Sequence, residues 1–79
     1  MSCQEKYNAI FINTFGVCLE DLNQRCSVKN VVAWDSMSHL SLVTALEEVF
    51  DIMLDAEDII EFDSYEKGKV ILSKYNIII

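Results

Sequence analysis

The polar segment from Trp34 to Leu40 contains the side chains of this sequence that are best placed to do chemistry. It reads Trp-Asp-Ser-Met-Ser-His-Leu, so a carboxylate at Asp35, a hydroxyl at Ser36 and an imidazole at His39 lie within five positions. A serine close to a histidine could form a nucleophile and base pair. A serine at an accessible helix start could instead accept a covalent group, or it could only cap the helix. The elements around the segment decide between these roles.

A helix is predicted to begin at this segment, with Asp35 or Ser36 as its cap. The positions up to Asp51 contain no glycine or proline, and their apolar side chains recur at helical spacing. At about 100° per residue, one arc of this helix is apolar and is expected to face the core. The core arc comprises Leu42, Val43, Ala45, Leu46, Val49 and Phe50, and the polar arc comprises Ser41, Thr44, Glu47, Glu48 and Asp51.

Two apolar side chains do not follow this division. Met37 falls within the polar arc and Leu40 on its margin, which indicates an exposed contact surface. His39 falls toward the core side of the first turn, so we expect a partly buried histidine that packs. Trp34 is expected to fill space in the core or to contact a hinge, and a role beside a ligand is the less favoured alternative.

The remaining pattern predicts a single all-α domain over residues 1–79. A first helix is expected at about residues 4–15, followed by a long loop over residues 17–34. A short third helix should start at Asp55, with Ile59, Ile60 and Phe62 on its apolar side. The fourth should span about residues 64–75, with Asp63 and Glu66 at capping-box spacing. The inward side chains of the outer two helices are expected to be Tyr7, Ile10, Phe11 and Phe15, and Tyr65, Gly68, Ile71, Leu72 and Tyr75.

Composition and charge argue against several classes of function. Six basic and thirteen acidic residues give a formal charge of −7, which opposes binding to nucleic acid. No apolar run approaches the roughly 18 residues of a membrane span, and no signal peptide is visible, so we expect a cytoplasmic monomer. Three cysteines without a C-x-x-C pair and one histidine predict no metal site; Cys18 and Cys26 should be small apolar side chains. The acidic residues from Asp51 to Asp63, including Asp58, lack EF-hand spacing and are expected to be solvated.

The Asp-Ser-Met triplet, followed by His-Leu-x-Leu-Val-x-Ala-Leu-Glu-Glu-x-Phe, resembles the acyl carrier protein family over most of the chain. The resemblance implies a four-helix bundle with a long loop between helices one and two and a short third helix. It also implies that Ser36 carries 4'-phosphopantetheine from coenzyme A, and that the protein is a carrier of acyl or aminoacyl thioesters and not an enzyme. Ser38 and Ser41 stand where fatty-acid carriers commonly have acids, and Met37 replaces leucine. With these departures, the segment is more similar to that of freestanding carriers of specialised fatty-acid, polyketide, peptide or polysaccharide pathways.

By the same resemblance, the partners would be a phosphopantetheinyl transferase and enzymes that load and process acyl groups. The recognition residues would be Asp35, Met37, Leu40, Ser41, Thr44, Glu47 and Glu48. The acyl cavity would be lined by His39, Leu42, Leu46, Ile59 and Phe62. Several of these side chains are bulky, so we expect a short or polar cargo, although Gly68 could open space.

The same residues allow two alternatives to a carrier. An acidic helical adaptor could use Met37, Leu40 and Thr44 for docking without a covalent cofactor. A Ser36–His39 nucleophile pair is disfavoured, because the sequence has no G-x-S-x-G elbow and no glycine-rich oxyanion loop.

Overall fold

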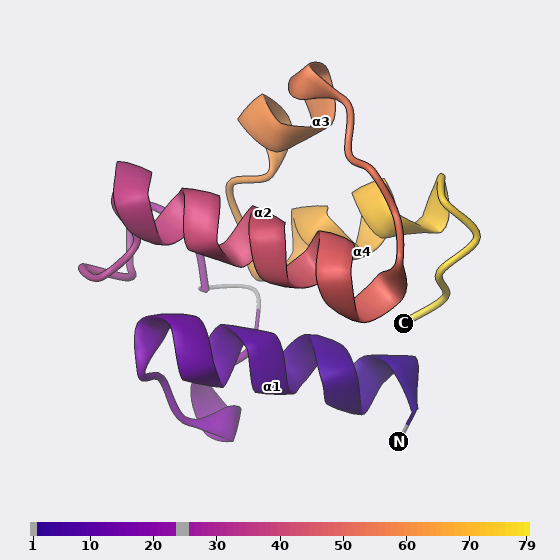
Figure 1. The fold of residues 1–79 in the computed structure, drawn as a ribbon. Coiled ribbons are helices and arrows are strands. Elements are labelled where there is room, and N and C mark those ends of the chain that lie inside the picture. Colours follow the sequence, from indigo (N-terminus) through magenta and orange to yellow (C-terminus); the bar gives the residue numbers. More distant parts are fainter. Residues whose placement is uncertain (1, 24–25) are drawn as a thin grey trace.

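The computed structural model describes residues 2–23 and 26–79, and the regular elements of this part of the chain are all helical. The described residues form four α-helices and one 3-10 turn, and among them there is no strand, only an isolated bridge between Ser27 and Ser64. The all-α prediction is confirmed, including a third helix of six residues. In order, the elements are α1 (Cys3–Phe15), η1 (Leu19–Asp21), α2 (Ser36–Phe50), α3 (Ala56–Glu61) and α4 (Tyr65–Ser73) (Figure 1).

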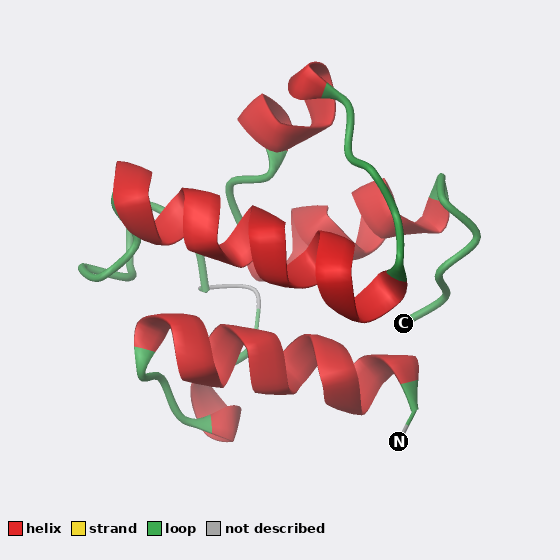
Figure 2. Cartoon of the chain, viewed as in Figure 1, coloured by secondary structure: helices red, strands yellow, loops and turns green. Residues whose placement is uncertain are grey.

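The two long helices form the base of the fold. α1 packs along α2, and the two run in opposite directions (Figure 1). α4 lies behind α2 in the same view, and α3 lies on the far side of α2 from α1 (Figure 2). The start of α2 is therefore at one end of the α1–α2 pair and is not covered by α1.

Local signals explain where the helices begin and end. The Ser2 hydroxyl and the Glu5 side chain form a capping box on α1, which ends at Gly16 in the left-handed region at φ 68°. α2 ends at Asp51, which also has a positive φ of 53°. The cap of α4 is Ser64, whose hydroxyl accepts a 3.0 Å hydrogen bond from the Lys67 amide, so the prediction of Asp63 as the capping residue was wrong.

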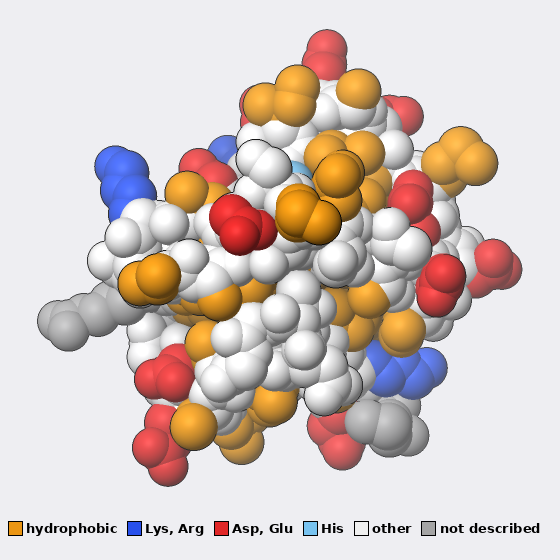
Figure 3. All heavy atoms as spheres, turned by 60° about the vertical axis from the view of Figure 1, so that its left-hand side comes forward, with side chains coloured by type: hydrophobic (Ala, Val, Ile, Leu, Met, Phe, Trp, Pro, Cys, Tyr) orange, Lys and Arg blue, Asp and Glu red, His pale blue; other side chains and the backbone are white. Residues whose placement is uncertain are grey.

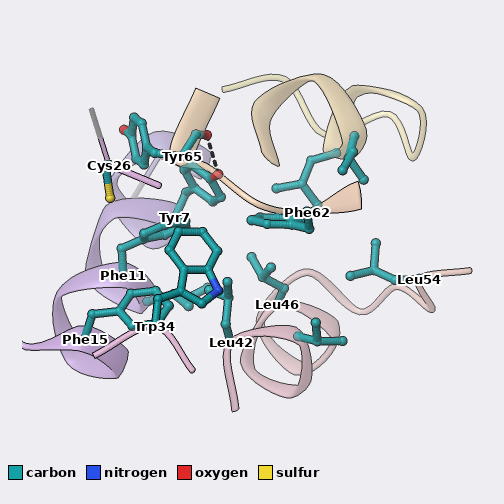
Figure 4. Close-up of a cluster of buried hydrophobic side chains, with 14 of the residues drawn as sticks. Tyr7, Phe11, Phe15, Cys26, Trp34, Leu42, Leu46, Leu54, Phe62 and Tyr65 are labelled. Carbon is teal, nitrogen blue, oxygen red and sulfur yellow. Dashed lines mark hydrogen bonds between the residues drawn. The ribbon is translucent and has the colours of Figure 1, made fainter. Parts of the chain in front are cut away.

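The core is built from aromatic side chains of α1 and aliphatic side chains of α2 and α4. Phe15 stacks on Trp34 with ring centroids 4.7 Å apart, and Phe11 meets the edge of the same indole (Figure 4). All four inward residues predicted for α1 are buried. Two predicted core positions are exposed, Val49 on α2 and Ile60 on α3. The fully buried side chains are Tyr7, Phe11, Leu42, Leu46, Phe62, Ile71 and Leu72.

Gly68 of α4 lies close to two core side chains, Tyr7 and Phe62. A Cβ atom there would lie 2.1 Å from the Tyr7 hydroxyl oxygen and 2.3 Å from Cζ of Phe62. The Tyr7 hydroxyl donates a 2.7 Å hydrogen bond to the Tyr65 carbonyl (Figure 4). Burial is the main cause that raises the pKa of Tyr7, so this hydroxyl stays protonated. The space that the missing side chain of Gly68 could have opened for cargo is filled by Tyr7 and Phe62.

The predicted loop of residues 17–34 contains η1 and several turns, and two of its residues, 24 and 25, lie outside the described part. It is attached to the segment between α3 and α4. The Val28 amide donates to the Asp63 carbonyl at 2.9 Å, and the Tyr65 amide donates to the Cys26 carbonyl at 2.8 Å. Cys26 is buried as predicted, whereas Cys18 is exposed. These contacts place Trp34, at the end of the segment, in the core directly before α2.

Candidate functional site

Ser36 is the first residue of α2, and its side chain is exposed. Asp35 caps the helix, since its Oδ1 accepts a 2.9 Å hydrogen bond from the Ser38 amide. This hydrogen bond is the main cause that lowers the pKa of Asp35. Within residues 2–23 and 26–79, Ser36 Oγ has no hydrogen bond. The capping role therefore belongs to Asp35, and the Ser36 hydroxyl is free to react.

A cleft of about 600 Å³ lies beside Ser36, between the start of α2, the α3 region and the segment before α2. Its surface is mostly apolar and it opens to solvent. Hydrophobic side chains gather on the face of the molecule shown in Figure 3. The cleft is lined by Val28, Trp34, Asp35, Ser36, His39, Leu40, Ile59, Ile60, Phe62 and Asp63.

His39 forms part of the cleft wall and is hydrogen-bonded through both ring nitrogens. The Trp34 indole N–H donates to His39 Nδ1 at 3.0 Å, and His39 Nε2 lies 2.7 Å from the Ile59 carbonyl oxygen. Because Nδ1 accepts and a carbonyl can only accept, the neutral ring carries its proton on Nε2. Neither nitrogen is therefore available to take a proton from Ser36. His39 is half-buried, as the helical projection predicted.

No protein-family model matches this sequence.

The cleft brings together three of the five predicted cavity residues, His39, Ile59 and Phe62. The other two, Leu42 and Leu46, do not line this cleft. Both side chains are fully buried in the core. Sequence reasoning missed Val28 from the segment before α2, Ile60 from α3 and Asp63 from the connection between α3 and α4. The apolar side predicted for the third helix included Ile60, whereas no periodic signal could assign Val28 and Asp63 to the cleft.

The predicted recognition face follows the exposed side of α2. Met37 is 80% exposed and Leu40 is 62% exposed, and Ser41, Thr44 and Glu48 are exposed as well. The Ser41 hydroxyl donates to the Met37 carbonyl at 3.2 Å. Glu47 lies on the predicted polar arc, but it is half-buried and its Oε2 accepts a 3.1 Å hydrogen bond from the Leu54 amide. Glu47 therefore holds the connection after α2, and Glu48 is the freely presented carboxylate.

Asp58 was expected to be solvated, and that prediction was wrong. It is 6% exposed and accepts hydrogen bonds from the Tyr75 hydroxyl at 2.5 Å and from Lys74 Nζ at 3.0 Å. The hydrogen bond from Tyr75 is the main cause that lowers the pKa of Asp58, and the one from Lys74 is the next. The hydrogen bond to Asp58 raises the pKa of Lys74. Asp58 thus joins α3 to the end of α4.

Two further properties concern the described helices and side chains. None of these helices is both long and apolar enough to cross a membrane. No cluster of three or more His, Cys, Asp or Glu side chains suited to a metal ion occurs within residues 2–23 and 26–79.

Proposed function

We propose that this protein is an acyl carrier that bears 4'-phosphopantetheine on Ser36. The observation that carries the proposal is the placement of the exposed Ser36 hydroxyl at the first residue of α2, at the edge of an apolar cleft. A transferase has to reach this hydroxyl from solvent, and any cargo needs apolar surface nearby. Both conditions are met at one point of the surface.

The residues around Ser36 fit the group that the proposal requires. The first turn of α2 has backbone N–H groups that favour a negative phosphate. Ser36 would hold the phosphate, and Leu40 and Ile60 would offer apolar surface to the arm. When bound, the group supplies a thiol that carries acyl or aminoacyl cargo as a thioester. Asp35 would repel the phosphate, so its role lies in capping the helix and in recognition by the transferase.

The attachment step follows from the free hydroxyl. Ser36 Oγ forms a bond to the phosphorus on the pantetheine side of coenzyme A, and the bond from that phosphorus to the bridging oxygen breaks. Adenosine 3',5'-bisphosphate leaves, and the serine proton passes to a base of the transferase. His39 cannot serve as that base, because its two nitrogens are bonded to Trp34 and Ile59.

The fold and the surface support the same proposal. Two long helices, a short α3 and a final α4 follow the order expected of an acyl carrier bundle. Partner enzymes would dock on Met37, Leu40, Thr44 and Glu48, where apolar and acidic side chains lie side by side on α2. The exposure of Met37 also favours the second candidate, a helical adaptor that binds a partner protein through this face without a covalent group.

Intact mass after incubation with coenzyme A and a broad-specificity phosphopantetheinyl transferase tests the proposal. Wild type should gain one phosphopantetheine, and Ser36→Ala should gain none. Ser41→Ala is the matched control, because Ser41 is another exposed serine on α2, and it should gain the group as wild type does. Wild type that stays unmodified, or modification that persists in Ser36→Ala, contradicts the carrier and leaves the adaptor.

A further inference from the structure

Where α2 meets α3, one wall of the cleft contains a chain of two hydrogen bonds. It runs from the indole of Trp34 through the imidazole of His39 to the carbonyl of Ile59. The indole and imidazole rings also stack, with centroids 6.2 Å apart and planes 24° apart. Trp34 is fixed in turn by Phe15 of α1, so the chain connects α3 through α2 to the base of the fold.

The core behind this wall is filled with side chains. Leu42, Leu46 and Phe62 are each fully buried, and the close approach at Gly68 is taken by Tyr7 and Phe62. A guest chain can therefore enter more deeply only if α3 moves away from α2. Core packing at this density does not open without displacing side chains.

α3 is held on its two sides by consecutive residues. Ile59 accepts the hydrogen bond from His39 of α2, and Asp58 binds Lys74 and Tyr75 at the end of α4. Only the first of these attachments borders the cleft, since Asp58, Lys74 and Tyr75 are not among the residues that line it. The two attachments can therefore be loosened separately.

We propose that the chain Trp34–His39–Ile59 is the specificity-determining wall of the cleft, and that it restricts the cargo to short acyl groups that lie along the open groove. This inference rests on the proposed function. His39 acts as a positioning residue, because it holds α3 at a fixed distance from α2. Longer acyl chains leave their distal methylenes in solvent while the wall is intact.

The wall is tested first in the protein without any attached group. Long-range 1H–15N correlation spectra report which ring nitrogen of His39 carries the proton, and the proposal requires Nε2. The Trp34 indole proton should exchange slowly with solvent, and it should exchange faster in His39→Leu, which offers the indole N–H no acceptor. An Nδ1-protonated His39, or an indole proton that exchanges at the same rate in both proteins, overturns the wall whether or not Ser36 can be modified.

The second test uses the holo protein loaded with straight acyl groups from acetyl to dodecanoyl. Each methylene that leaves water should favour a sequestered chain about fourfold, which would appear as a rising melting temperature. In wild type the melting temperature should stop rising after the short acyl groups of the series. In His39→Asn it should continue to rise with longer chains, with methyl shifts near Ile59 and Phe62. His39→Gln, which can still donate to the Ile59 carbonyl, should restore the wild-type limit.

Asp58→Asn is the matched control for a general loosening of α3. It should lower the melting temperature and leave the limit on chain length unchanged. Any one of three results overturns the proposal. Wild type could sequester dodecanoyl, His39→Asn could keep the wild-type limit on chain length, or Asp58→Asn could extend that limit as His39→Asn is expected to do. If His39→Asn does not fold, Trp34→Phe breaks the same chain at its other end and takes its place. Failure of Ser36 to be loaded at all is read from intact mass and contradicts the proposed function instead.

Discussion

The Tyr7 hydroxyl occupies the position that a side chain on residue 68 would need. A Cβ atom at Gly68 would lie 2.1 Å from this oxygen, and the Phe62 ring is nearly as close. Gly68→Ala should therefore destabilise the protein by about 3 kcal/mol, the upper part of the range for overpacked cores, despite the better helix propensity of alanine. Urea denaturation measures this change.

Gly16→Ala is the matched control for that substitution. Gly16 has a φ of 68°, and no described residue comes within 4 Å of the position that a Cβ atom would take, so only backbone strain is added. The expected loss is about 1–2 kcal/mol. The double variant Tyr7→Phe with Gly68→Ala should lose less stability than the sum of the two single variants, because the phenylalanine lacks the nearest clashing atom. Strict additivity would contradict the geometry at Gly68.

The contact between Asp58 and Lys74 predicts how stability depends on pH. The pKa of Asp58 is lowered in the folded state, so its contribution is present above the unfolded value of about 4 and is lost as pH falls through the folded pKa. The pKa of Lys74 is raised, so its contribution is present below about 10.4 and is lost as pH rises through the folded pKa. Free energies of unfolding for wild type and Asp58→Asn should differ most at neutral pH and converge toward both extremes. A difference that grows on acidification would show that Asp58 is not held by these partners.

Met37 is predicted to act in recognition and not in stability. Met37→Ala should change the free energy of unfolding by less than about 0.5 kcal/mol, because the side chain is 80% exposed. It should slow modification of Ser36 by the transferase, since an apolar contact at the docking face is lost. Met53→Ala, at a methionine that is 82% exposed between α2 and α3, is the control and should be modified at the wild-type rate. If the transferase modifies the two variants at equal rates, Met37 is not part of the docking face.

Glu47 and Glu48 should respond differently to charge reversal. Glu48→Lys should slow association with the transferase most at low salt and leave stability nearly unchanged, because this side chain is exposed. Glu47→Lys should also lower the melting temperature, since it removes the acceptor of the Leu54 amide. Thermal unfolding and association rates at two salt concentrations separate the two effects. If both variants unfold at the wild-type temperature, the contact from Glu47 to Leu54 does not contribute to stability.

Helical periodicity in the sequence was sufficient to predict the helices and much of the core. The inward faces of α1 and α4, the burial of Leu42 and Leu46, the exposure of Met37 and the position of Ser36 at the start of α2 all follow from spacing along one helix. Spacing within a helix is a local property, because residues three or four apart share a face whatever the rest of the chain does.

Only the tertiary structure decided what the polar side chains bind. His39 reaches Ile59 twenty residues later in the chain, and Asp58 reaches Lys74 sixteen residues later. Helical spacing does not determine contacts between elements, so the sequence pattern predicted a solvated Asp58 and did not reveal its partners Lys74 and Tyr75. The position of α3 relative to α2 determines that Ile60 and Val28 line the cleft beside Ser36 and that Leu46 belongs to the core. That position depends on packing between elements, which the sequence pattern of any single element does not contain.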